Sequence, residues 1–200
     1  MSAPVQSFEA SLPQFIGLRM RADEFFQIPD DGHNYELIDG VVTMTPSPAP
    51  KHQAVLMEIT TQIGMFLRDH ATGQALPEID VHLGEGPTGG DLVYRPELVF
   101  IRTERLPEID DRVVGAPDLV VEIISRGSRR FDSETKKDDY ERFGVREYWL
   151  IDPEQESMTF FRLVGGRYIE VPPIGNTFPS EAIRGFTLDL ARVRQAFRPW

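Results

Sequence analysis

Apolar and polar residues follow two different spacings along this chain, and these spacings predict its helices and strands. Residues 119–124 form an apolar run broken by a single acid, Glu122, which is typical of a central strand buried on both faces. Residues 51–70 place apolar side chains three and four positions apart, which predicts a long helix that ends near Gly73. A shorter helix is expected over residues 22–27.

Turn-forming pairs mark one hairpin near each end of the chain. Asp39-Gly40 lies between two short apolar runs, so residues 35–44 are predicted to form a hairpin with a tight turn. Gly165-Gly166 separates the two runs of a second hairpin, at residues 158–163 and 167–171.

The middle of the chain is read as strands with one short helix. Strands are expected at residues 78–83 and 92–101, the second broken by Pro96, which marks an edge, an end or a bulge. A helix at residues 133–142, with Asp132 or Ser133 as its N-cap, separates the central strand from another strand at 145–151. A strand, a helix and a second strand in this order imply a parallel crossover within a largely antiparallel sheet.

These elements predict an α/β (α+β) fold, a mixed β-sheet flanked by helices with hairpins near the N- and C-terminus. Two hundred residues suit one domain with a full core. We expect residues 1–20 to form a flexible N-terminal arm and residues 21–200 to form the single domain.

Composition narrows the classes of protein. The absence of cysteine excludes disulfides and thiolate metal sites and agrees with a cytoplasmic location. No apolar run reaches the roughly 18 residues of a membrane span, and the first 13 residues do not resemble a secretory signal. The net charge of −11 argues against a broad nucleic-acid surface, although basic residues gather between Arg126 and Arg146.

Two glutamates carry the strongest indication of chemistry. Burying an unpaired Glu122 costs several kcal/mol, so it needs a metal, a cation or hydrogen bonds. Glu97 opens the preceding strand, and if the two strands are neighbours the carboxylates can lie about 5 Å apart, which suits one Mg²⁺ ion. The alternative is that Glu97 is an exposed residue at the start of its strand.

Asp118 is a rival to Glu97 as the partner of Glu122. It shares a face with Glu122 but stands four residues away on the same strand, which is about 13 Å. The two acids cannot hold one ion, so we expect Asp118 to make local hydrogen bonds.

Lys136 is the basic candidate, and it shares a helix face with Tyr140. It could orient a water nucleophile or stabilise charge on phosphorus, whereas taken alone it reads as a solvent-exposed lysine in the first helical turn. Glu36 could assist from the first hairpin, or it could be a surface acid. For His52, at the start of the long helix, a capping or solvent role is favoured over a place in a site.

Five motifs together resemble the Uma-two family, which is assigned to the restriction-endonuclease-like PD-(D/E)XK nuclease superfamily. Four of them are the runs YELIDG from Tyr35, RPELVF from Arg95, APDLVVEIIS from Ala116 and GVREYWLIDP from Gly144. The fifth is the set of Asp132, Lys136 and Tyr140, spaced four residues apart. They occur in the family's order and span nearly the whole chain.

The resemblance implies a nuclease-like site at one edge of the sheet. The family's acidic positions match Glu36, Glu97 and Glu122, and its helix lysine matches Lys136; at position 97 the usual residue is Asp. A lysine two residues after the second acid would complete the superfamily motif, and Ile124 stands there instead.

Two functions from different classes follow. The first is a Mg²⁺-dependent DNA endonuclease, with Mn²⁺ as an alternative ion, in which Glu97 and Glu122 hold the metal. The second is a catalytically inactive nuclease fold that serves as a dimeric binding or regulatory module. In either case we expect a homodimer that binds nucleic acid, most of all DNA, and that does not associate with a membrane.

Overall fold

The computed structural model describes residues 13–45, 48–125 and 127–198, and its strands divide between two larger sheets. The six-stranded sheet has the order β11-β10-β9-β8-β6-β3, and the five-stranded sheet has the order β2-β1-β5-β4-β7. In chain order, the strands are β1 Tyr35–Ile38, β2 Val41–Met44, β3 Gly73–Pro77, β4 Val81–Glu85, β5 Asp91–Tyr94, β6 Leu98–Arg102, β7 Val113–Val114, β8 Leu119–Ile123, β9 Glu147–Asp152, β10 Ser157–Val164, β11 Arg167–Glu170, and a separate pair, β12 Thr177–Pro179 and β13 Thr187–Asp189.

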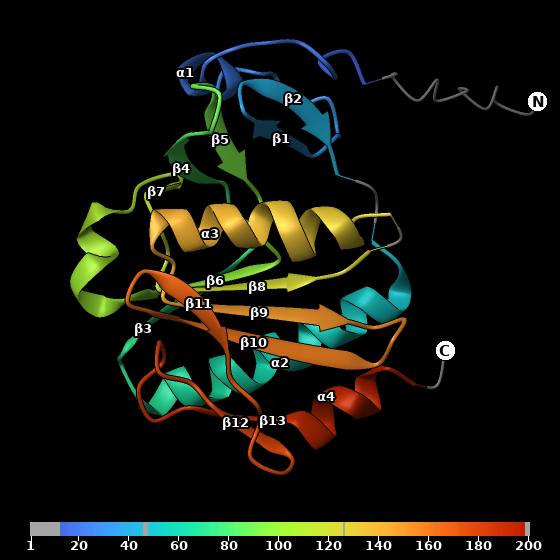
Figure 1. Cartoon of the computed structure of the whole chain (residues 1–200), viewed down its shortest axis with the longest axis vertical. Helices are drawn as coiled ribbons and strands as arrows, with labels where there is room; N and C mark the ends of the chain where they lie inside the picture. Colours follow the sequence, from blue (N-terminus) through green and yellow to red (C-terminus); the bar gives the residue numbers. More distant parts are fainter. Residues whose placement is uncertain (1–12, 46–47, 126, 199–200) are drawn as a thin grey trace, which may run out of the picture.

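The helices cover both faces of the six-stranded sheet (Figure 1). α2 (Pro50–Asp69) and α4 (Leu190–Ala196) pack on one face, and α3 (Lys137–Phe143) lies on the other. The five-stranded sheet stands beyond α3, together with the short helix α1 (Ala22–Phe25). A 3₁₀ helix (Thr103–Glu108) follows β6, and a π-helix (Phe131–Lys136) leads directly into α3. The predicted mixed sheet flanked by helices is therefore confirmed.

The predicted strand over residues 92–101 is two strands in two different sheets. β5 belongs to the five-stranded sheet and β6 to the six-stranded sheet, so Arg95, Pro96 and Glu97 form the crossing between them. Pro96 lacks a backbone N–H and cannot donate a hydrogen bond to a ladder, which agrees with both strands stopping beside it. The crossing brings Glu97 to the place where the two sheets diverge.

β8 is central, as the apolar run predicts, and its alternation decides where Glu122 points. It pairs antiparallel with β6 and parallel with β9. Leu119, Val121 and Ile123 face the core under α2, whereas Val120 and Ile124 face the core under α3. Glu122 therefore lies on the α3 face, and the parallel crossover to β9 is confirmed.

Both hairpins are confirmed, with β1 paired to β2 and β10 to β11. Asp39 and Gly40 take positive φ angles of 51° and 76°, as a two-residue hairpin turn of this twist requires. The predicted strand at 78–83 is wrong in its bounds, because Glu78 has a φ of 48° and lies between β3 and β4. β3, β7 and β12 were not predicted.

The expected arm lies partly outside the described residues, which begin at Pro13. Within them, the Gly17 N–H donates to the Val42 carbonyl (2.8 Å) and the Met20 N–H donates to the Gly40 carbonyl (2.9 Å). None of the helices in the described ranges is long and apolar enough to cross a membrane.

Candidate active site

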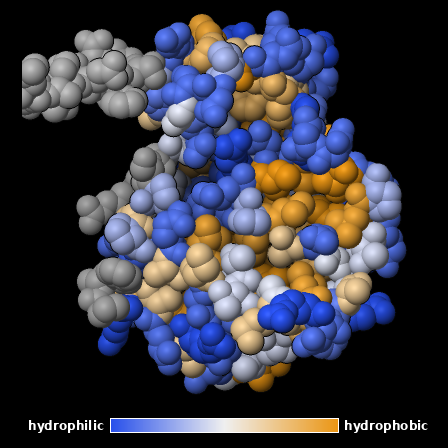
Figure 2. Space-filling model, turned by 180° about the vertical axis from the view of Figure 1, so that it is seen from behind, coloured by the Kyte–Doolittle hydropathy of each residue, from blue (hydrophilic) through white to orange (hydrophobic). Residues whose placement is uncertain are grey.

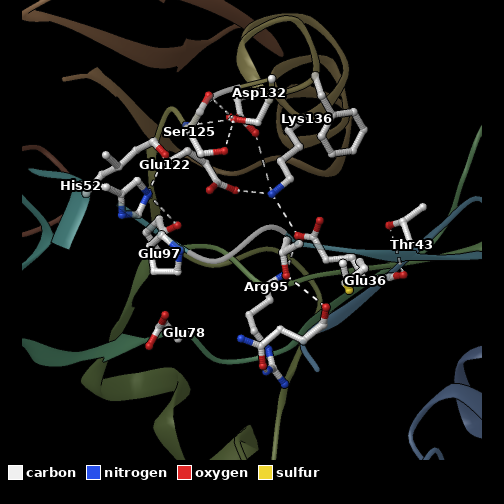
Figure 3. A pocket seen from close by; sticks show the side chains of 18 of the residues that line it. Glu36, Thr43, His52, Glu78, Arg95, Glu97, Glu122, Ser125, Asp132 and Lys136 are labelled. Atoms are coloured by element: carbon white, nitrogen blue, oxygen red, sulfur yellow. Dashed lines mark hydrogen bonds and ion pairs between the residues drawn. The ribbon is translucent and has the colours of Figure 1, made fainter. Parts of the chain in front are cut away.

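A pocket of about 420 Å³ opens where the two sheets diverge, and it gathers every residue that the sequence proposed for the site. Glu36 comes from β1, Glu97 from the crossing, Glu122 from β8 and Lys136 from the π-helix (Figure 3). His52 and Asp132 also line the pocket. The β6–β8 ladder ends where Leu98 is opposite Val121, so Glu97, directly before Leu98, and Glu122, directly after Val121, lie at the same end of this strand pair.

Lys136 is buried among acids and does not project into solvent. Its Nζ lies 2.9 Å from Glu36 Oε1, 3.0 Å from Glu122 Oε1 and 4.0 Å from Asp132 Oδ1. Burial lowers the pKa of the Lys136 ammonium, but the neighbouring Glu122, Glu36 and Asp132 raise it well above its usual value. The Lys136 ammonium therefore keeps its charge near neutral pH, and the alternative of a solvent-exposed lysine is wrong, because Lys136 is 4% exposed.

Glu122 is held from the same helix by a second side chain. The Tyr140 hydroxyl donates to Glu122 Oε1 at 2.8 Å, and Tyr140 stands one helical turn after Lys136. Burial raises the pKa of Glu122 to about 8; the Lys136 charge opposes this shift, and the surrounding acids add to it. Burial thus disfavours the charged form of this carboxyl group, and further positive charge would stabilise it.

Glu36 joins β1 to the π-helix and to the crossing between the two sheets. Its Oε1 accepts from Lys136 Nζ and from the backbone N–H of Arg95, each at 2.9 Å. The alternative of a surface acid is wrong, because Glu36 is buried.

Glu97 is bound by His52, which the sequence interpretation assigned to capping or solvent. That assignment is wrong. His52 is only 4% exposed, and its Nε2 lies 3.1 Å from Glu97 Oε1 and 2.9 Å from the Ile123 carbonyl. Burial lowers the pKa of His52, yet the contacts with Glu97 and Ile123 outweigh burial and raise it. The signal was available: His52 precedes Val55, Ile59 and Ile63 at helical spacing, on the buried face of the helix.

Asp132 was predicted as a possible N-cap, and this is also wrong. The helical backbone already includes Arg130, and Asp132 is buried inside the π-helix, where it accepts a hydrogen bond from the Ser128 hydroxyl. Burial and the nearby Glu36 and Glu97 raise its pKa, against the opposing effects of Lys136 and Ser128. Its spacing of four residues from Lys136 was the signal that it shares the lysine's surroundings.

Asp118 stays outside the site, as expected. It is buried near the other end of β8, where it accepts from the Arg102 N–H (3.1 Å) and Arg102 Nε (2.9 Å). Arg105 and Arg146 lie 3.4 and 3.7 Å from its carboxylate. Its role is to hold the strand end.

The pocket's charge and donors fit a Mg²⁺ ion. Five acids line the pocket together with Lys136 and Arg95, and Glu97 Oε2 is buried without a hydrogen-bond partner. Across the described ranges, no group of three or more His, Asp or Glu side chains is arranged to hold a metal. Mg²⁺ is commonly bound through only one or two carboxylates, with water or substrate phosphate completing its shell, so a two-carboxylate site agrees with its chemistry.

The Uma2 family, described as "Putative restriction endonuclease", matches residues 22–191. A crystal structure described as a "putative nuclease belonging to DUF820" from Anabaena variabilis ATCC 29413 aligns with a TM-score of 0.73 and 19% identity, covering 90% of this chain and 99% of that one. At that identity the likeness shows the fold alone, and a search of curated proteins found no match. The family match covers most of the chain, which therefore belongs to the Uma2 family and has a nuclease-like fold.

Proposed function

We propose that the protein is a Mg²⁺-dependent endonuclease of the PD-(D/E)XK type that hydrolyses phosphodiester bonds in DNA. One observation carries the proposal: a buried lysine lies within 3.0 Å of two buried glutamates in a pocket that Glu97 also lines. An ordinary core would not retain these charges, because isolated buried ions cost several kcal/mol each. Perturbed, mutually dependent ionisable groups in a pocket are typical of active sites.

Glu97 and Glu122 would hold the Mg²⁺ ion, for which Mn²⁺ could substitute. When bound, such an ion lowers the pKa of a coordinated water and polarises the phosphate. The buried Oε2 of Glu97 supports this assignment because it has no hydrogen-bond partner. Glu122 supports it because burial disfavours its charged form, which a cation would stabilise.

Lys136 would act on the reacting groups directly. An ammonium has three N–H donors, and Glu36 and Glu122 accept two of them. Asp132, at 4.0 Å, is beyond hydrogen-bond distance, which leaves one donor for a water nucleophile or a phosphate oxygen. Glu36 would hold the ammonium in this position.

The alternative is an inactive nuclease fold that binds as a dimeric module. It is favoured by the short contacts of Lys136, which already compensate two of the acids, and by the net charge of −11, which disfavours DNA binding. A homodimer is proposed in either case. Figure 2 shows an apolar patch with hydrophilic surroundings on the face opposite that of Figure 1, and such patches commonly mark interaction surfaces. Light scattering would give the mass in solution.

Cleavage assays decide between the two functions. Supercoiled plasmid, single-stranded DNA and RNA are incubated with the protein in Mg²⁺, Mn²⁺ or EDTA. The endonuclease requires cutting of DNA that EDTA abolishes and that is lost in E122Q purified in parallel. Absence of cutting together with absence of ion binding would leave the binding module as the better account, and preferential cutting of RNA would correct the substrate.

A further inference from the structure

His52 connects three elements that meet at the pocket, and no proposed role yet accounts for it. It belongs to the first turn of α2, on the opposite side of the six-stranded sheet from Lys136. Its ring reaches the sheet end where Glu97 and Ile123 lie (Figure 3). Nε2 contacts the Glu97 carboxylate and the Ile123 carbonyl, and Ile123 follows Glu122 directly.

The hydrogen on His52 is fixed by these neighbours. Both atoms near Nε2 are acceptors, so Nε2 must carry the proton and donate. The other nitrogen, Nδ1, is buried and has no partner, so the ring gains nothing polar from its opposite side. A buried ring whose polar contacts all lie at one atom is oriented by those contacts.

Glu97 needs such support more than its neighbours do. Glu36 accepts from Lys136 and Arg95, and Glu122 accepts from Lys136 and Tyr140. Among the described residues, the Glu97 carboxylate has a polar contact with His52 alone. Glu97 also follows Pro96 in the crossing between the sheets, outside the ladder that would fix a strand residue. A glutamate has three side-chain torsions, so holding it in one orientation requires a partner.

The geometry points to His52 as a positioning residue that fixes the Glu97 carboxylate beside Glu122 so that the pair can bind a divalent ion. This inference rests on the proposed metal site and deepens it. In this role His52 acts through its Nε2, which is engaged by Glu97 Oε1 and the Ile123 carbonyl and leaves Glu97 Oε2 for the ion. Outer partners of metal ligands commonly change ion affinity 10–100-fold when they are removed.

The chain offers a matched set of variants. H52Q places an amide N–H near the position of Nε2, whereas H52N places one near Nδ1, where there is no acceptor. Q62L is the control: Gln62 is a buried polar residue ten positions further along the same helix, about 15 Å away, and its hydrogen bonds go to Asp189 and Glu58. It tests the loss of buried hydrogen bonds in α2 without touching the site.

Calorimetric titration of the EDTA-treated full chain with Mn²⁺ and Mg²⁺ tests the inference without any activity. We expect the ion Kd of H52N to rise about 10–100-fold, that of H52Q to stay near the parent value, and that of Q62L to be unchanged even if urea unfolding shows it less stable. In E97Q the further change H52N should have no effect, because His52 acts through Glu97. H52L replaces H52N if H52N does not fold.

The outcomes separate this inference from the proposed function. An ion-binding parent with H52N binding equally well overturns the positioning role and leaves the metal site standing. The positioning role is also overturned if H52N and Q62L weaken ion binding equally, or if H52N weakens ion binding as much in E97Q as in the parent. Either result would mean general destabilisation. A parent that binds neither ion overturns the metal site, and the role of His52 falls with it.

Discussion

The charge balance of the pocket gives the most specific prediction, for the substitution K136M. Methionine keeps the unbranched apolar length of lysine and removes the ammonium. Three acids lie within 4.0 Å of that ammonium, and Lys136, Glu36, Glu122 and Asp132 are each at most 4% exposed. Removing one partner of a buried ion pair costs about 3–5 kcal/mol. We expect a loss of that size in the free energy of unfolding, measured in EDTA at pH 8.

The acids can recover part of this loss by binding protons or metal. Glu122 has a pKa of about 8 with Lys136 present, and removing the neighbouring positive charge can only raise it. The penalty should therefore shrink as the pH falls toward 6. A divalent ion should also restore stability, by about 2.7 kcal/mol at a concentration of 100 times its Kd. Cleavage should nevertheless drop by about 10²–10³-fold or more, because the ion cannot replace the N–H donor.

Urea unfolding of the parent, K136M and K137M provides the assay. K137M makes the same change in net charge one residue away, where the nearest acid is the exposed Asp138 at 3.8 Å, so it should cost less than about 1 kcal/mol. If K136M and K137M unfold at the same urea concentration in EDTA at pH 8, Lys136 does not compensate the acid cluster. If K136M cuts DNA as fast as the parent, the activity belongs to other residues or to a contaminant.

Three further predictions use positions of known geometry. In EDTA, E122Q should be increasingly more stable than the parent between pH 5 and 9, as measured by urea unfolding at each pH. The pKa of Glu122 is raised from its ordinary value of 4.5 to about 8 in the folded state, so the parent loses stability as the pH rises through that range. D118N should unfold several kcal/mol more easily, because three arginines lose their buried anion, and should bind Mg²⁺ in calorimetry like the parent. G64A should raise the melting temperature slightly, since its Cβ meets nothing, whereas in G73A the Cβ would collide with the Ile101 carbonyl and the chain should be destabilised.

The sequence predicted those parts of the site that depend on regular strands and on one face of a helix. The apolar run around Glu122 predicted a central strand, and the neighbouring β6 begins just after Glu97, so the two acids lie at the same end of this strand pair. Lys136 and Tyr140 share a helix face, and both contact Glu122 Oε1. Periodicity alone carries this information, because it fixes which side chains share a face.

Asp132 and His52 were not predicted as site residues, because local sequence rules indicate simpler roles for them. An aspartate before a polar helix is ordinarily a cap, but the π-helix begins upstream and carries Asp132 inward. A histidine after prolines at a helix start is ordinarily exposed, but the apolar stripe of α2 includes position 52. Pro96 marked a break within residues 92–101, but both halves have the same apolar character, and only tertiary pairing assigns them to two different sheets.

The positions where these rules failed are the π-helix and the buried charges. Both cost free energy that a protein adapted for folding alone would avoid. Glu36, Glu97, Glu122 and Asp132 come from four different segments, so their mutual repulsion acts between the two sheets and the helix, not within one element. Burial and the neighbouring acids raise the pKa of Glu122, and the Lys136 charge opposes this rise without cancelling it. A pocket lined by five acids against Lys136 and Arg95 keeps an excess of negative charge, which a further cation would compensate. Ion binding and the packing of the two sheets should therefore be thermodynamically coupled, with stability rising as the ion is added.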